Sequence, residues 1–224
     1  MKKRVIVLLI LSVFLATTGL CSAHEMYINV SNGKVTTVNL RWNQKNSSTG
    51  RLKINADGSY LSGDWAGTNY NSAKTAWHSS QVPVECVEFP TNPNTYFCTT
   101  SKEYWKSKIP DILWGEIMAY TELYDTNGKI INSYDEANAS TKQIKGANIY
   151  VKPNPTNNTT FDYASTMSHE IGHVLCLGHS HLTEYSPADT TKDPSIMSYN
   201  YLALKKSYNP QNHELNDVKN MYGY

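Results

Sequence analysis

The chain has 224 residues, of which 40% are hydrophobic and 17% charged, with 12 glycines and 9 prolines. These proportions suit a globular protein with one sizeable core, and they exclude collagen-like, coiled-coil and wholly disordered chains. The formal net charge at pH 7 is +1, and no basic run interleaves with aromatic residues, so nucleic acid is not an expected partner.

The N-terminal segment has the composition of a secretory signal peptide over residues 1–23. A basic start at 2–4 precedes an almost wholly apolar run at 5–20 and a small-residue exit that ends at Ala23. We therefore expect a secreted protein, extracellular or periplasmic, with no stable membrane association after cleavage. An uncleaved membrane anchor is the alternative, although the apolar run is short for a spanning helix. Cleavage after Ala23 leaves 17 basic and 19 acidic residues, a net charge of −2.

The first part of the mature chain is predicted to form a strand, a helix and a hairpin. Apolar and polar residues alternate over 35–42, which is typical of a strand, and apolar residues recur at helical spacing over 65–81. Two short strands at 84–89 and 95–99 flank a turn-rich loop, which predicts a hairpin. Because export permits disulfides, we expect a bridge across this hairpin between Cys86 and Cys98, which leaves Cys176 unpaired.

The second part of the chain is predicted to contain three more strands and two helices. Bulky or alternating residues predict strands at 112–124, 129–134 and 147–152, of which the first two are joined by a strong turn signal. An uninterrupted run without proline predicts one helix over 163–175. Apolar residues three apart predict a closing helix over 210–224.

The helix predicted at 163–175 carries a His-Glu-x-x-His motif. Four residues advance an α-helix by about 400°, so His169 and His173 share one face and can each reach one zinc ion. Glu170 lies one step round the helix, where it can accept a proton from zinc-bound water but is poorly placed to be a ligand. His179 supplies a third imidazole if the chain folds back after the helix. Three protein ligands leave one coordination position open, which is typical of a catalytic zinc site.

Together with Met197 and its neighbours, this motif resembles that of the metzincin clan of zinc endopeptidases. The matching stretches are HEIGHVLCLGHS at 169–180 and SIMSY at 195–199. In the clan, a tight methionine-containing turn lies beneath the metal, and Met197 matches that methionine. The serine after the third histidine is similar to the matrixin branch. Tyr199 is more similar to the serralysin and astacin pattern, in which the tyrosine hydroxyl stabilises the tetrahedral intermediate, and a packed aromatic is its alternative interpretation.

The resemblance implies an α/β (α+β) fold of the zincin-like kind, with a twisted mixed sheet, a long active-site helix and a small C-terminal subdomain. It implies a single catalytic domain over 24–224, with an upper subdomain over about 24–179 and a lower one over about 180–224. The chain departs from the clan at Cys176, where the motif has glycine. A left-handed backbone there costs a non-glycine residue about 1–2 kcal/mol. Cys176 is also an alternative zinc ligand.

These residues predict a zinc metalloendopeptidase that binds one catalytic Zn²⁺ and acts as a monomer on protein or peptide substrates. Glu170 is expected to be the general base and Tyr199 the donor to the oxyanion. The substrate is expected to lie along an edge strand at 147–151. The other histidines are scattered, so no second zinc is expected, and Ca²⁺ sites cannot be assigned. A zinc-binding or adhesion module without turnover and a zinc amidase acting on non-protein amides are the alternatives.

Overall fold

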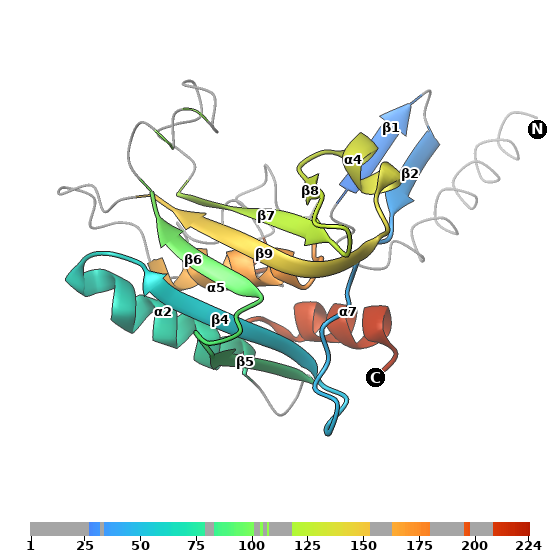
Figure 1. The fold of residues 1–224 in the computed structure, drawn as a ribbon. Coiled ribbons are helices and arrows are strands. Elements are labelled where there is room, and N and C mark those ends of the chain that lie inside the picture. The colour runs from blue at the N-terminus through green and yellow to red at the C-terminus, as the bar shows by residue number, and fades with distance from the viewer. Residues whose placement is uncertain are drawn as a thin grey trace, which may run out of the picture.

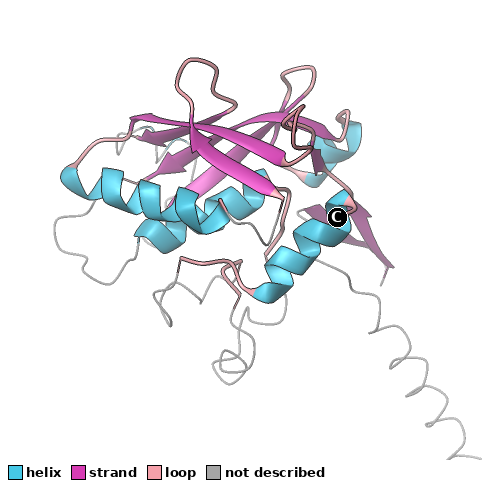
Figure 2. Cartoon of the chain, turned by 90° about the horizontal axis from the view of Figure 1, so that it is seen from below, coloured by secondary structure: helices cyan, strands magenta, loops and turns pink. Residues whose placement is uncertain are grey.

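The computed structural model describes residues 27–31, 34–78, 83–100, 104, 107, 118–152, 163–179, 195–197 and 208–224. In this part of the chain, a mixed sheet forms one layer, and the helices α2 and α5 pack against each other on one of its faces (Figure 1). The view from below shows the same two layers (Figure 2). The predicted signal peptide lies outside the described residues, and no helix among them is long and apolar enough to cross a membrane.

The described part of the chain contains nine strands and four helices. The strands are β1 Tyr27–Ser31, β2 Lys34–Val38, β3 Arg41–Trp42, β4 Leu52–Tyr60, β5 Val84–Glu88, β6 Thr95–Thr99, β7 Ala119–Asp125, β8 Ile130–Ile131 and β9 Gln143–Val151. The helices are α2 Asp64–Trp77, α4 Tyr134–Ala139, α5 Tyr163–Val174 and α7 Asn212–Tyr222. The predicted helices at 65–81, 163–175 and 210–224 are therefore confirmed as α2, α5 and α7.

The main sheet is mixed and has the strand order β5-β4-β6-β9-β7-β8, with β3 pairing to β9. The strands β4, β5, β6 and β9 run parallel to one another, whereas β7 is antiparallel to β9 and β8 is antiparallel to β7. A separate antiparallel pair, β1–β2, lies outside this sheet. The predicted α/β (α+β) class with a mixed sheet and a motif-bearing helix is thus confirmed.

The core lies between the sheet and the two helices. On β6, the fully buried Phe97 packs on Tyr70 of α2, with ring centroids 4.8 Å apart. Since side chains alternate along a strand, its neighbour Tyr96 lies on the opposite face of the sheet. Trp77 of α2 is fully buried and its indole Nε1–H donates to the carbonyl of Ser168 at 2.8 Å. This bond holds α2 against α5.

Three predicted strands have different bounds in the structure. The strand expected at 35–42 is two strands, β2 and β3, which pair in different sheets. The strand expected at 147–152 begins earlier, as β9 at Gln143. The strand expected at 129–134 is only β8, because Ser133 caps the start of α4 by accepting a hydrogen bond from the amide of Glu136 at 3.2 Å. Of the strand expected at 112–124, residues 112–117 lie outside the described residues.

The predicted hairpin of 84–89 and 95–99 is wrong. The strands β5 and β6 are parallel to β4 and pair with opposite edges of it, so β4 separates them. The turn between them exists, since the amide of Asn92 donates to the carbonyl of Phe89 at 3.3 Å. Asn94 then binds β4 through its backbone amide, which donates to the carbonyl of Asn55 at 3.0 Å. The turn therefore carries the chain across β4 and not back along β5.

The predicted Cys86–Cys98 disulfide is wrong for the same reason, and both residues are free thiols. Cys86 pairs opposite Ile54 of β4, and Cys98 pairs opposite Tyr60 of the same strand. Two strand spacings place them about 9–10 Å apart sideways, and six residues of β4 add about 20 Å along the strands. A disulfide needs Cα atoms within about 7 Å. Burial also raises the pKa of the Cys86 thiol to about 12.

Candidate metal centre

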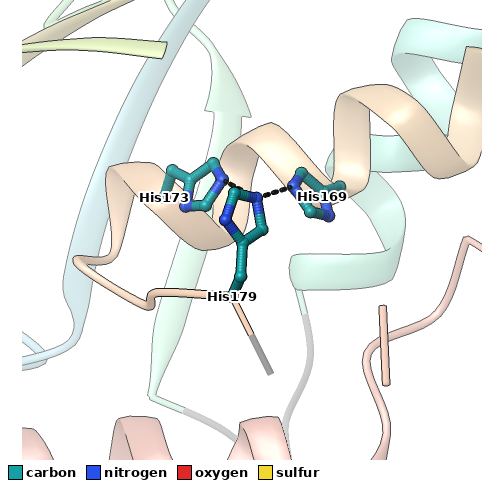
Figure 3. A group of neighbouring side chains, drawn as sticks. All are labelled: His169, His173 and His179. Atoms are coloured by element: carbon teal, nitrogen blue, oxygen red, sulfur yellow. Dashed lines mark hydrogen bonds between the residues drawn. The ribbon is translucent and has the colours of Figure 1, made fainter. Parts of the chain in front are cut away.

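Three histidine side chains converge beside α5. His169 and His173 lie one turn apart on this helix, and His179 follows it (Figure 3). Their ligand atoms all lie within 4.8 Å of one another. The Nε2 atom of His179 is 3.1 Å from Nε2 of His169 and 3.2 Å from Nε2 of His173. The residue trio predicted from the motif is thus brought together in the described part of the chain, whereas Cys176 is not in the group.

Cys176 reverses the chain so that His179 can reach the helix. It has a φ of 65°, the left-handed region that favours glycine. Its amide donates to the carbonyl of His173 at 2.9 Å, and the amide of Leu177 donates to the carbonyl of Gly172 at 3.0 Å. These two bonds form a Schellman motif, which ends a helix with a left-handed residue. The turn that glycine makes in the clan is therefore made here by a buried cysteine, at a backbone cost of about 1–2 kcal/mol.

Backbone carbonyls orient the two helical imidazoles. Nδ1 of His169 lies 2.7 Å from the carbonyl oxygen of Ile196, and Nδ1 of His173 lies 2.7 Å from that of Leu177. A carbonyl only accepts, so each Nδ1 carries the proton and each Nε2 presents a lone pair to the centre. Burial lowers the pKa of His169, and the hydrogen bond to the carbonyl of Ile196 opposes this shift. The neutral ring favoured by this burial is the form that binds metals.

The spacing of the nitrogens fits a zinc ion. Two nitrogens that bind a tetrahedral zinc at about 2.1 Å lie about 3.4 Å apart. The separations from the His179 nitrogen, 3.1 and 3.2 Å, are close to this value. Two buried lone pairs aimed at a third imidazole nitrogen are hard to satisfy by hydrogen bonds alone, because a single N–H can serve only one of them well. His169, His173 and His179 therefore have the chemistry and spacing of a zinc-binding set.

Glu170 points from α5 toward the sheet. Its Oε2 accepts a hydrogen bond from Oγ1 of Thr121 on β7 at 2.7 Å, and only 4% of the residue is exposed. Burial raises the pKa of Glu170 to about 7, although the hydrogen bond from Thr121 lowers it. The carboxylate is not among the converging ligand atoms. Its assignment as general base stays a prediction, and Thr121 is a partner that the sequence analysis missed.

Met197 lies directly beneath α5 and is fully buried. A Cβ atom at Gly172 would overlap its sulfur, would lie 3.1 Å from its Cε, and would lie 3.5 Å from Cζ2 of Trp77. Only glycine therefore lets the methionine approach the helix this closely. The preceding residue, Ile196, supplies the carbonyl that orients His169. The turn at Ser195–Met197 thus gives the histidine site both an apolar floor and one of its orienting groups.

A buried carboxylate on α7 holds this turn in place. Oε1 of Glu214 accepts a hydrogen bond from Oγ of Ser195 at 2.6 Å. The Oγ of Ser195 in turn accepts a hydrogen bond from the amide of Met197 at 3.0 Å. Glu214 is fully buried, and its Oε2 also accepts from the amide of Gln211 at 2.6 Å. The sequence analysis missed Glu214. The Gln-x-x-Glu spacing at the start of α7 is a capping-box signal that could have identified it.

Two other expectations about the site have different outcomes. Tyr199 lies outside the described residues, so its role as oxyanion donor stays a prediction. The edge strand expected at 147–151 is wrong, because β6 pairs with one side of these residues and β7 with the other. The strand that contacts α5 through Thr121 is β7. Its partner β8 pairs only with Leu123 and Tyr124.

No protein-family model matches the sequence, and no curated protein matches it. Among solved structures, the chain is similar to high choriolytic enzyme 1 (HCE-1), a hatching enzyme zinc-protease from Oryzias latipes (medaka fish). The two are 15% identical with a TM-score of 0.43, and the alignment covers 87% of this chain and 99% of that chain. The metal centre described above is inferred from this chain's own residues and not from that likeness.

Proposed function

We propose that this protein is a secreted zinc-dependent endopeptidase of the metzincin type. The observation that carries the proposal is the convergence of three imidazole nitrogens, with Glu170 next to one of the ligand residues on the same helix. The signal-peptide pattern at 1–23 supports export. We propose one zinc ion per chain, since the described residues contain one group of three or more metal-binding side chains. We also propose that the protein acts as a monomer.

The residues of the site have separate tasks in this proposal. A zinc ion held by the three imidazoles would act as a Lewis acid on the scissile carbonyl and lower the pKa of water to near 7. Glu170 takes the proton of the attacking water and returns it to the leaving amine nitrogen. Thr121 orients the carboxylate of Glu170 through the 2.7 Å hydrogen bond. Tyr199 donates to the oxyanion as charge develops on it.

We propose that a peptide substrate lies along the first half of β7. Thr121 of this strand contacts Glu170, so a chain bound there would pass close to the base. A strand edge binds an extended peptide through main-chain hydrogen bonds. Because these bonds do not involve the side chains of the peptide, many peptide sequences can bind. Such pairing supports cleavage inside unfolded or loop segments of proteins.

The test combines metal analysis with cleavage of casein and of a peptide library. The protein should contain one zinc per chain and lose all cleavage in a chelator. Glu170→Ala should keep the zinc and lower the rate by about 10²–10⁴-fold, whereas the matched surface variant Asp135→Ala should cleave normally. His179→Ala should lose zinc, whereas His78→Ala, at an exposed position after α2, should keep it.

Three results would separate this proposal from its alternatives. If the Glu170→Ala variant cleaves casein and peptides as well as the unaltered protein does, the proposed endopeptidase is refuted. Zinc binding with no cleavage of any substrate would indicate a binding or adhesion module. Products from muropeptides but not from proteins, measured by mass spectrometry, would indicate an amidase.

A further inference from the structure

A cavity of about 460 Å³ lies on the sheet, and none of the residues of the metal centre lines it. Its lining comes from four neighbouring strands and three connecting segments. On β6, the lining residue Tyr96 is next to Phe97, which faces α2. On β9, the lining residue Asn148 lies between the buried core residues Ala147 and Ile149. The cavity is therefore on the face of the sheet opposite the one that α2 and α5 cover.

The chemistry of the lining is that of amides and phenol rings. Five side-chain amides contribute, together with two tyrosines and a single charged side chain. The amides belong to Gln44, Asn55, Asn92, Asn94 and Asn148. The charged residue is Lys145, and its Nζ donates to the carbonyl of Thr126 at 2.9 Å. No carboxylate lines the cavity, so it does not suit a metal ion, and one engaged ammonium does not suit a polyanion.

Asn55 carries an acceptor that the protein does not use. The residue is only 7% exposed, and its Nδ2 donates to the carbonyl of Asn92 at 3.1 Å. Its Oδ1 is buried and has no hydrogen-bond partner. A buried acceptor left unpaired costs about 1–3 kcal/mol. Asn55 itself lines the cavity, so this unpaired acceptor is buried within the cavity wall.

The walls around this acceptor are held in place before any ligand binds. Asn94 ties the loop to β4, because its Oδ1 accepts from the amide of Asn55 at 2.9 Å and its Nδ2 donates to the carbonyl of Lys53 at 3.0 Å. Its carbonyl accepts from the amide of Ala147 on β9 at 2.9 Å. Such a preformed site loses little conformational entropy when a ligand binds.

Tyrosine rings extend the site in two directions. The ring of Tyr60, which is 59% exposed, lies 6.1 Å from the ring of Tyr96. On the other side, Nδ2 of Asn148 donates to the hydroxyl of Tyr124 at 2.6 Å and to that of Tyr150 at 3.0 Å. The rings of Tyr150 and Tyr120 stack with centroids 4.9 Å apart. Further phenol rings therefore lie next to the lining residues Tyr96 and Asn148.

We propose that this cavity is a binding site for a neutral oligosaccharide. Side-chain amides as a class carry both donors and acceptors, which matches the paired donor and acceptor character of sugar hydroxyls. The apolar face of a sugar ring can pack on a tyrosine ring and bury apolar surface there. The volume lies within the range of ligand pockets. The site is on the other face of the sheet from the histidines, so the protein could hold a glycan and keep its metal centre free.

The glycine at 146 offers a variant that closes the cavity. A Cβ there would lie 3.4 Å from the carbonyl oxygen of Asn94 and 4.0 Å from Cβ of Tyr124, both ordinary contacts. The Cβ atom of Gly146→Val therefore fits without a clash, and its two methyl groups would fill part of the cavity. A β-branched residue also suits a strand. Tyr96→Leu is the second variant, since it removes a ring from the lining. Gly67→Ala is the matched control, because nothing lies within 4 Å of a Cβ at that position.

The test is a glycan array of neutral oligosaccharides, followed by calorimetric titration with the best trisaccharide. Both are run in EDTA, so the outcome does not depend on zinc or on cleavage. We expect saturable binding, weakened about tenfold or more by Gly146→Val and by Tyr96→Leu, and unchanged by Gly67→Ala. Thermal unfolding of each variant shows that it is folded. If Gly146→Val does not fold, Tyr96→Leu alone decides.

Any one of the following results would overturn the proposal. They are no saturable binding of any neutral glycan, binding that both cavity variants keep in full, binding that Gly67→Ala weakens as much as they do, and stronger binding of trigalacturonate than of neutral trisaccharides. Competition by an unglycosylated casein peptide for the same site would instead identify a polypeptide-binding surface, and it too would overturn a saccharide site.

Discussion

Gly172 allows a quantitative test of how Met197 supports the metal-binding helix. In a helix interior, replacing glycine by alanine stabilises the folded state by about 0.5–1 kcal/mol. At Gly172 the new methyl group would overlap the sulfur of Met197 and lie 3.5 Å from Cζ2 of Trp77. Both neighbours are fully buried, so neither can move into solvent. Overpacking of this kind costs about 1–3 kcal/mol.

The matched control is Gly67 on α2, where an added Cβ atom would have nothing within 4 Å. Gly67→Ala should therefore show the helix propensity alone and stabilise by about 0.5–1 kcal/mol. Gly172→Ala should fall short of Gly67→Ala by about 1–3 kcal/mol, because it adds the overlap to the same propensity gain. For a chain of this size, that difference corresponds to roughly 2–12 °C in Tm.

The assay is chemical unfolding followed by tryptophan fluorescence, with the zinc content held constant across the variants. A double-mutant cycle with Met197→Ala isolates the contact, and the coupling between Gly172→Ala and Met197→Ala should be about 1–3 kcal/mol. If Gly172→Ala stabilises the protein as much as Gly67→Ala does, then the methionine does not pack against this helix as described.

Zinc should stabilise the folded protein, and at a free zinc concentration 100-fold above Kd the gain in stability is about 2.7 kcal/mol. A thermal shift assay should therefore show a higher Tm with zinc. An equal rise in the Tm of His179→Ala would contradict the site. Without reductant, iodoacetamide should alkylate Cys86, Cys98 and Cys176 in the denatured chain, and a linked peptide pair in mass spectrometry would refute the strand order. Burial raises the pKa of Glu214, but the hydrogen bond and charge of His213, together with the donors of Ser195 and Gln211, outweigh burial and hold that pKa below its usual range. Its contribution is present above the unfolded pKa of about 4.3 and is lost as pH falls through the lower folded value. Glu214→Gln should cost about 1.5–3 kcal/mol at pH 7 and flatten the loss of stability in acid, measured by urea unfolding; an unchanged acid limb would contradict this.

Local sequence rules were sufficient for the helices α2, α5 and α7, but they missed the short helix α4. The motif on α5 depends only on the helical repeat, so the shared face of His169 and His173 follows from their spacing of four residues. The helices α2 and α7 were likewise predicted from apolar spacing. These features involve residues a few positions apart, and the backbone geometry of a helix is the same in any protein that contains one.

The position of His179 was only partly determined by the sequence. The motif placed a histidine six residues after His173, and the left-handed turn was expected at Cys176. Whether a cysteine would adopt that conformation depends on the surrounding contacts, because the Schellman bonds and the burial of the side chain must outweigh the backbone strain. That balance is set by the folded structure.

Residues far apart in the chain were decided by the tertiary structure alone. The strands β5 and β6 looked like a hairpin because a turn joins them, but both pair with β4, whose two edges are invisible in the sequence. The bonds from Glu214 to Ser195 and from Thr121 to Glu170 also join distant segments. The sequence by itself determined the helix and the ligand types that it carries. The tertiary structure decided which strand and which turn surround them, because burial of the core and pairing of strand edges act between any segments that folding brings together.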